Sequence, residues 1–162
     1  VETPEDLQRC LDETGCDGVM TSESALENPA MFDGTPTSRT AQAAITREYL
    51  DLARAHPPRG VAILKAHIFK LLFMALDHHR DLRDRLGSTM EMDAVYAIAV
   101  EACEREEAEA KAHPEAMSAR CDMEGGRSTS WYRRHRAGSK AEGEAKAEGE
   151  AKADEREPRP SS

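Results

Sequence analysis

The sequence predicts an α/β segment, then an all-α helical bundle, then a disordered charged tail. Three observations support this order. Residues 1–34 alternate between helical and strand-like patterning, as in one step of an α/β protein. Residues 38–112 carry apolar side chains at helical spacing. Residues 137–162 contain no Leu, Ile, Val, Phe or Met, so burial cannot offset the entropy lost on ordering them.

The composition describes one domain at most, with 162 residues, a net charge of -9 and 39% hydrophobic residues. No apolar run approaches the roughly 20 residues that cross a bilayer, and the N-terminus lacks a signal-peptide pattern. We therefore expect an intracellular protein, cytoplasmic or nuclear, with no membrane partner. The cysteines are scattered without a Cys-x-x-Cys pair, which predicts reduced thiols at Cys10, Cys16, Cys103 and Cys121. Because the sequence opens at Val1 directly with helix-start residues, we expect a piece of a longer chain.

The first segment is predicted to contain a helix, a strand, a turn and a second helix. Thr3-Pro4-Glu5-Asp6 offers an N-cap hydroxyl, a proline at the first helical position and two acids in the first turn. Gly15 suits the left-handed position that ends a helix. Residues 16–20 predict a short buried strand, and the polar turn 21–24 leads into an apolar segment at 25–32. One strand cannot make a sheet, so the other strands are expected upstream.

The second segment predicts three or four packed helices. The first covers residues 40–55, with Ile45, Tyr49 and Leu52 on one face, and Pro57-Pro58 ends it. The next helix has the strongest periodicity of the chain, a core-facing stripe of Ile63, Leu64, Ile68, Leu71, Leu72, Ala75 and Leu76. Ser88 or Thr89 is expected to cap a further helix, which runs on into a solvated acidic stretch at 104–107.

Residues 113–136 form a basic aromatic extension. Its most basic part is Trp131-Tyr132-Arg133-Arg134-His135-Arg136, and no acidic residue occurs between Glu124 and Glu142. Arginine pairs with phosphate, while Trp and Tyr stack on unpaired bases. The alternative is a docking segment whose aromatic rings pack back onto the fold. Residues 137–162 repeat Lys-Ala-Glu-Gly-Glu-Ala at 140–145 and 146–151, a pattern typical of a solvated linker or a transient helix.

The turn at residues 21–24 is a candidate anion site. It joins the end of the predicted strand to the start of a helix, where backbone N–H groups lack intrahelical partners and favour phosphate. Such turns are also common as plain connectors in α/β proteins.

A longer phrase around this turn resembles a known family. Gly18-Val19-Met20-Thr21-Ser22-Glu23-Ser24 followed by Asn28-Pro29-Ala30-Met31-Phe32 is similar to the last strand and phosphate-binding turn of the tRNA-dihydrouridine synthases. The Ser22-Glu23 pair resembles the eukaryotic 16/17-type branch. The likeness continues through Glu48-Tyr49-Leu50 and residues 65–72 and covers roughly residues 3–107.

The resemblance implies a fold, a cofactor and a reaction. Residues 1–34 would be the last βα unit of an FMN-binding (β/α)8 TIM barrel, and residues 38–112 a helical tRNA-binding domain. Ser22 and Glu23 would offer backbone N–H groups to the FMN phosphate, and NADPH would be the reductant. Ser24 departs from the glycine usual in the family, which would weaken the site if a positive φ is needed.

No catalytic residue is assigned. The family's cysteine general acid lies in an Asn-x-Gly-Cys-Pro context, and none of the four cysteines matches it. This segment alone is therefore expected to be inactive.

The predicted RNA-binding residues fall in two places, on the second bundle helix and in the basic extension. They are Lys65, Lys70, Arg133, Arg134 and Arg136. On the helix, ordinary solubility is the competing interpretation, since acidic residues lie close by.

We expect no metal site. His67 is interpreted as a hydrogen-bonded packing residue. His78 and His79 are adjacent and not one turn apart, so their side chains are expected to diverge.

Two functional hypotheses follow. The first is a monomeric flavin-dependent tRNA-dihydrouridine synthase that reduces a D-loop uridine to 5,6-dihydrouridine. The alternative is a non-catalytic helical RNA-binding or protein-docking module. A third and weaker interpretation keeps an FMN barrel but changes its chemistry.

Overall fold

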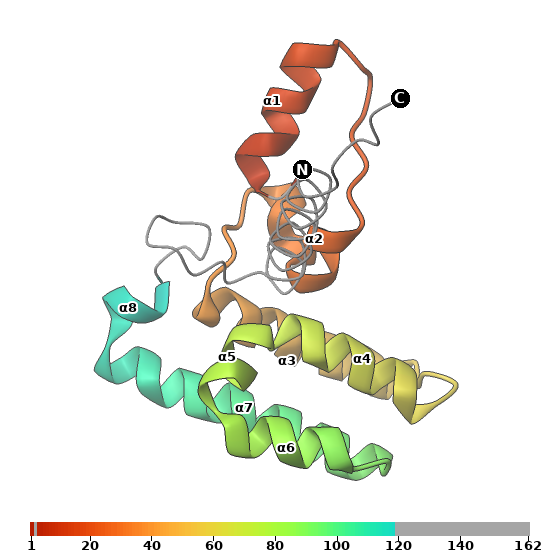
Figure 1. Ribbon diagram of the computed structural model, residues 1–162, viewed down its shortest axis with the longest axis vertical. Helices are drawn as coiled ribbons and strands as arrows, with labels where there is room; N and C mark the ends of the chain where they lie inside the picture. The colour runs from red at the N-terminus through yellow and green to blue at the C-terminus, as the bar shows by residue number, and fades with distance from the viewer. Residues whose placement is uncertain (2, 119–162) are drawn as a thin grey trace, which may run out of the picture. The chain divides into compact units, whose positions relative to one another are not determined.

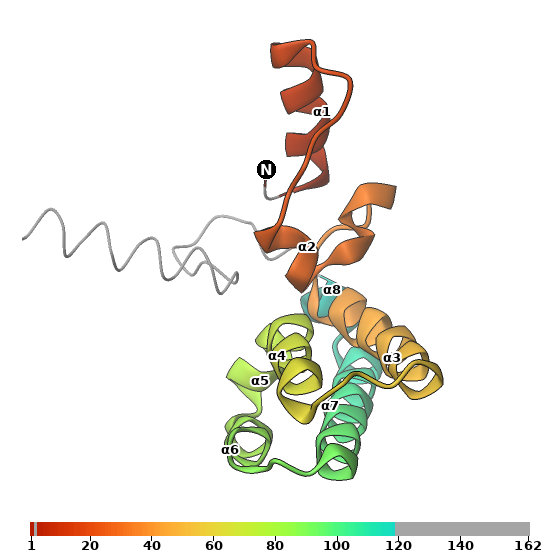
Figure 2. The same cartoon turned by 90° about the vertical axis from the view of Figure 1, so that its right-hand side faces the viewer.

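The computed structural model describes residues 1 and 3–118 of the chain, all within one compact unit. The basic stretch 131–136, Cys121 and the charged tail lie outside the described residues. The described part is all-helical, with the helices shown in Figures 1 and 2. No described helix is both long enough and apolar enough to cross a bilayer.

The first helix, α1 (Pro4–Thr14), begins and ends where the sequence predicted. The Thr3 hydroxyl accepts a hydrogen bond from the Asp6 N–H at 3.2 Å, and the Asp6 carboxylate accepts one from the Thr3 N–H. These reciprocal bonds satisfy two donors that the helix itself leaves unpaired. At the other end Gly15 adopts a φ of 64° and donates to the Leu11 carbonyl at 2.9 Å.

The strand predicted at residues 16–20 does not form, and the described residues contain no strand. The α/β prediction is therefore wrong for this part of the chain. A strand needs a neighbouring strand to satisfy its backbone groups, and no described segment supplies one. The apolar side chain of Met20 is 93% exposed, and within residues 16–20 only Val19 is half-buried.

Two short helices lead into the bundle, α2 (Glu23–Glu27) and the 3-10 helix η1 (Pro29–Asp33). The buried side chain of Asn28 fixes their junction, because its amide donates to the Thr35 carbonyl at 2.8 Å and to the Thr37 hydroxyl at 3.1 Å. η1 contacts α1 and α2. Gly34 ends η1 with a φ of 89°.

The bundle consists of five helices and is closed by a sixth. They are α3 (Arg39–Ala55), α4 (Val61–Leu71), α5 (Phe73–His78), α6 (Arg80–Ser88), α7 (Met92–Ala112) and α8 (Pro114–Ser118). α7 packs along α3 and also contacts α4, α5 and α6, so it is the central element (Figures 1 and 2). α8 covers one end of α3 and α7, where Met117 is buried and the Thr40 hydroxyl donates to its carbonyl at 3.0 Å.

The predicted stripe on the second bundle helix is confirmed. Every member except Ile63 is buried, and Leu64, Ile68 and Leu72 are fully enclosed. The helix is not continuous, because Leu72 leaves helical geometry and separates α4 from α5. Short helices α5 and α6 then turn the chain back toward α7.

The predicted faces and caps of two helices differ from the structure. On α3, Leu52 is 55% exposed, and the buried face is formed by Gln42, Ala43, Thr46, Leu50 and Ala53. Small and polar side chains dominate this face, so apolar periodicity does not reveal it. The last bundle helix begins at Met92, and neither Ser88 nor Thr89 is its N-cap.

Candidate functional site

The predicted phosphate turn lies at the start of α2. Ser22 is the residue before the helix and Glu23 its first residue, so the helix begins inside the turn predicted at residues 21–24. The hydroxyls of Thr21 and Ser24 both donate to the carbonyl oxygen of Val1, each at 3.1 Å. Two donors from the turn thus converge on one oxygen atom.

The glycine-to-serine departure costs no backbone strain in this structure. Ser24 lies inside α2, and no described residue other than glycine has a positive φ. Its hydroxyl adds a donor that glycine lacks. Position 24 does not need a positive φ here, so a serine at this position does not weaken the turn through backbone strain.

The turn presents hydrogen-bond donors to an oxygen acceptor. The Val1 carbonyl is that acceptor in this structure, bound by both hydroxyls. The Ser22 and Glu23 N–H groups belong to a helix start, which favours an anion. The carboxylate of Glu23 opposes that preference. None of the described residues is assigned to the isoalloxazine ring.

Lys65 is held by the C-terminal end of α6. Its ammonium donates to the carbonyls of Gly87 at 2.6 Å and Thr89 at 2.9 Å, at the C-terminal end of α6. A cation there complements the negative end of the helix dipole. The side chain thus ties α4 to α6. Lys70 is half-buried in the last turn of α4. The predicted arginines Arg133, Arg134 and Arg136 lie outside the described residues.

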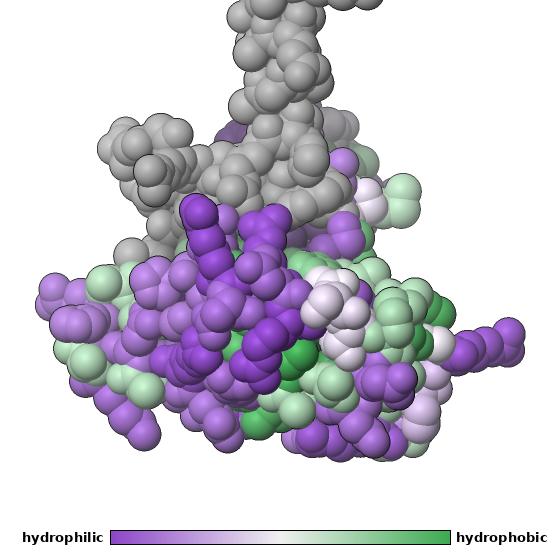
Figure 3. All heavy atoms as spheres, turned by 60° about the horizontal axis from the view of Figure 1, so that its bottom comes forward, coloured by the Kyte–Doolittle hydropathy of each residue, from purple (hydrophilic) through white to green (hydrophobic). Residues whose placement is uncertain are grey.

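Several other basic side chains of the bundle pair with acids of α6 and α7. Arg47 pairs with Glu107, and Arg105 binds Asp81 bidentately at 3.0 and 2.8 Å. Arg105 also pairs with Glu101 at 2.6 Å. Figure 3 shows a bundle face covered mainly by such hydrophilic side chains. Among the described residues, Arg59 and Arg80 are exposed and form no ion pair.

These pairs shift the ionisation of the acids. The hydrogen bond from Arg105 holds the pKa of Asp81 below its usual value. Arg105 and then Arg85 lower the pKa of Glu101 in the same way. Each carboxylate therefore favours its charged form, which strengthens the attachment of α6 to α7.

A buried ion pair joins the ends of α3 and α7. The Arg39 guanidinium binds both oxygens of Glu106, with an Nε–Oε2 distance of 2.7 Å, and reaches Glu109 Oε2 at 2.9 Å. The Glu106 residue is 1% exposed. Burial alone would lower the pKa of Arg39, but the hydrogen bonds and charges of Glu106 and Glu109 outweigh it and raise that pKa.

Sequence reasoning missed this pair because residues 104–107 were interpreted as a solvated stretch. The signal was present in the spacing. Val95, Ala99, Ala102 and Glu106 continue the same buried helical face at intervals of three or four. An acid in register with a core stripe indicates a buried, paired carboxylate.

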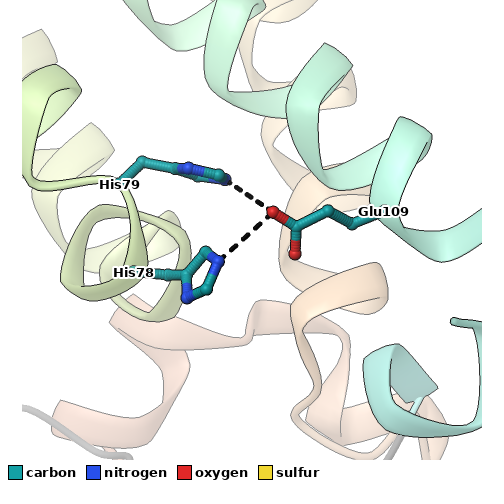
Figure 4. Close-up of side chains that lie close together, drawn as sticks. All are labelled: His78, His79 and Glu109. Atoms are coloured by element: carbon teal, nitrogen blue, oxygen red, sulfur yellow. Dashed lines mark ion pairs between the residues drawn. The ribbon is translucent and has the colours of Figure 1, made fainter. Parts of the chain in front are cut away.

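The structure confirms the prediction for one histidine and contradicts it for two others. The packing role predicted for His67 is confirmed, because its Nδ1 lies 2.8 Å from the Tyr49 hydroxyl and the two rings meet edge to face. The divergence predicted for His78 and His79 is wrong. Both rings point at the same carboxylate oxygen of Glu109 (Figure 4). The backbone break between α5 and α6 allows this, because His79 is not helical.

Comparison with known proteins gives a family. The family described as "Dihydrouridine synthase (Dus)" matches residues 1–121. A mouse protein named "tRNA-dihydrouridine(16/17) synthase [NAD(P)(+)]-like" is 36% identical over 98 residues, which are 60% of this chain and 20% of that protein.

A Saccharomyces cerevisiae protein named "tRNA-dihydrouridine(16/17) synthase [NAD(P)(+)]" is 33% identical over 92 residues, which are 52% of this chain and 22% of its own length. The chain thus spans about a fifth of the length of these curated relatives. No solved structure matches it significantly. Since the family match covers most of the sequence, the chain belongs to the dihydrouridine synthase (Dus) family.

Proposed function

We propose that this chain is the C-terminal part of a flavin-dependent tRNA-dihydrouridine synthase of the 16/17 type, and that its helical bundle holds the tRNA substrate. The observation that carries the proposal is the family match over residues 1–121. Relatives named for dihydrouridine synthesis at tRNA positions 16 and 17 support the substrate.

In this function the cofactor carries out the reaction, and the described residues bind its phosphate. FMN, reduced by NADPH, supplies the hydride chemistry. The hydroxyls of Thr21 and Ser24 and the N–H groups of Ser22 and Glu23 would hold its phosphate, by the geometry of the α2 turn. This part of the protein then anchors one end of the cofactor and contributes no catalytic side chain.

The bundle would bind the tRNA. A uridine within a folded tRNA must leave its stack to reach a flavin, so a separate domain that grips the tRNA is physically reasonable. Most basic side chains of the bundle are already paired with acids. The strongest phosphate contacts are therefore proposed at Arg133, Arg134 and Arg136, with Lys65 and Lys70 in lesser roles.

A chimera tests the whole proposal. The present chain replaces the matching C-terminal segment of the S. cerevisiae relative, and dihydrouridine at positions 16 and 17 is measured in tRNA from cells that lack the yeast enzyme. We expect modification to be restored. A chimera that folds and retains FMN, yet restores none, would contradict the proposal and favour a non-catalytic module.

The same chimera separates tRNA binding from flavin chemistry. The triple change Arg133→Ala, Arg134→Ala and Arg136→Ala should reduce tRNA modification and leave NADPH oxidation without tRNA unchanged. The matched control is Lys140→Ala, Lys146→Ala and Lys152→Ala, which removes the same charge from the tail. Equal losses from both triples would mean that only net charge matters.

A further inference from the structure

We infer that His78, His79 and Glu109 form a binding site for a divalent transition-metal ion of the Zn²⁺ class. His78 ends α5, His79 lies between α5 and α6, and Glu109 lies in the last turn of α7. The three side chains converge in Figure 4 from segments thirty residues apart. The inference does not depend on the proposed function.

The distances suit a tetrahedral ion. Glu109 Oε1 lies 3.3 Å from His78 Nε2 and 3.5 Å from His79 Nε2. Zn²⁺ binds such atoms at about 2.0–2.2 Å, which places neighbouring ligand atoms of a tetrahedron about 3.3–3.6 Å apart. The two imidazole nitrogens lie within 4.8 Å of each other. The His78 side chain is 56% exposed, so it has room to rotate toward the ion.

Hydrogen bonding alone explains the arrangement less well. Charge-assisted bonds between nitrogen and a carboxylate measure about 2.7–2.9 Å, and both contacts to Glu109 are longer. His79 Nε2 also lies 3.1 Å from Glu106 Oε1. Metal binding would replace that contact, and Glu106 would keep both hydrogen bonds from Arg39.

The surroundings orient the ligands and tolerate the charge. Arg39 holds Glu109 Oε2 at 2.9 Å, which leaves Oε1 directed at the histidines. Such supporting bonds are typical of metal sites. Glu106 and Glu109 carry two negative charges against one positive charge on Arg39, so a dication is not opposed by the net local charge.

The donor set selects the class of ion. Two imidazoles and one carboxylate suit Zn²⁺, Cu²⁺ or Ni²⁺, whereas Mg²⁺ and Ca²⁺ prefer oxygen ligands throughout. Three protein ligands leave a position for water, and the His78 side chain is 56% exposed, which gives the ion an entry path.

The expected role is a cross-link between the α5–α6 junction and α7. The unfolded chain does not hold residues 78 and 109 together, so the ion binds the folded state preferentially. A free-ion concentration of 100 times the dissociation constant would then raise the ratio of folded to unfolded chain about a hundredfold. The site therefore couples metal supply to the stability of the bundle.

Equilibrium dialysis of the whole 162-residue chain against Zn²⁺ tests the site, with thermal unfolding as a second readout. We expect saturable binding and a higher unfolding temperature with metal. His78→Ala and Glu109→Gln should each weaken binding at least tenfold. Their matched controls, His56→Ala and Glu104→Gln, replace exposed residues of the same types away from the cluster and should bind like the parent.

The thiols require a separate check, because Zn²⁺ also binds cysteine. Replacing Zn²⁺ by Co²⁺ gives visible bands typical of tetrahedral nitrogen and oxygen ligands, without the near-ultraviolet charge-transfer band of thiolate ligation. A thiolate band, an absence of binding, or equal affinity in the parent and His78→Ala would overturn the site. Because His78 is exposed, its replacement leaves the core intact, and circular dichroism verifies this.

Discussion

Glu106 is the residue whose environment departs most from its sequence context. It lies in an acidic run, yet its side chain is buried and bound on both oxygens by Arg39. A buried pair is a weak source of net stability, but removing the charge of Glu106 leaves Arg39 with Glu109 alone as its counter-charge. Glu106→Gln should therefore lower the free energy of unfolding by about 2 kcal/mol.

Urea denaturation followed by circular dichroism measures this loss. Glu107→Gln is the matched control, because Glu107 is the next residue along α7 and pairs with Arg47 at the surface. Exposed pairs contribute less than about 1 kcal/mol. Equal losses in the two variants would show that Arg39 is not held as described.

The cysteines of the described region differ in reactivity for physical reasons. Burial raises the pKa of the Cys103 thiol to about 11. The Thr14 hydroxyl, 3.0 Å from the Cys16 sulfur, lowers the pKa of that exposed thiol. Because the thiolate is the reactive form, iodoacetamide should alkylate Cys16 well before Cys103 in the native chain.

Peptide mass spectrometry gives the order of alkylation. Thr14→Val removes the hydrogen bond and should slow alkylation of Cys16 at neutral pH. Simultaneous labelling of Cys16 and Cys103 in the native chain would contradict the burial of Cys103.

At the level of elements, acid-sensitive ion pairs attach α6 to α7. The folded-state pKa values of Asp81 and Glu101 lie below their ordinary values of 3.8 and 4.5. Groups with lowered pKa values stabilise the fold above the ordinary value, and that contribution disappears as the pH falls through the folded value. The attachment should therefore be complete above pH 4.5 and weaken progressively below it.

Arg105→Met isolates this effect, because Arg105 binds both acids. The parent should be more stable than the variant above pH 4.5, and the difference should shrink as the pH falls below 3.8. Unfolding measured across that range gives the difference. A gap independent of pH would mean that Arg105 acts only through packing of its aliphatic stem.

Lys65 links α4 to the end of α6 through two carbonyls. Lys65→Met keeps the length of the side chain and removes both bonds, so it should lower the free energy of unfolding by about 1 kcal/mol. Thermal unfolding and tRNA binding of the variant measure the two roles separately. Unchanged stability with weaker tRNA binding would favour the RNA contact predicted from the sequence.

The sequence predicted those elements whose formation depends on neighbouring residues in the chain. The α1 caps depend on Thr3, Asp6 and Gly15 alone, and the α4–α5 stripe on the spacing of large apolar residues. The buried face of α3 could not be predicted in this way, because Gln42 and Thr46 are buried by their partners. The strand at 16–20 failed for a related reason, since strands depend on a neighbour.

The site residues also differ in whether a local sequence pattern could predict them. A helix start near residues 21–24 was predictable because it is a local feature, although α2 begins at Glu23 and the predicted segment began at Ala25. The cluster of His78, His79 and Glu109 was not, since it requires both the break after α5 and the packing of α7. Side chains brought together by tertiary structure leave no fixed spacing in the sequence.

For the whole molecule, the distribution of charge matters more than the net charge of -9. Within the described part, acids of α6 and α7 pair with Arg39, Arg47, Arg85 and Arg105, so the bundle surface is mixed in sign. An RNA-binding role then depends on basic side chains that have no acidic partner nearby. The stretch from Arg133 to Arg136 has that property in the sequence.

The salt dependence of tRNA binding by the 162-residue chain tests the tRNA-holding role most directly. Anisotropy of labelled tRNA is measured between about 50 mM and about 200 mM salt. Replacing Arg133, Arg134 and Arg136 by alanine should weaken binding and reduce the logarithmic salt slope by about 2, while the triple lysine control should match the parent. Absence of tRNA binding by the parent, or identical slopes for all three proteins, would contradict the tRNA-holding role.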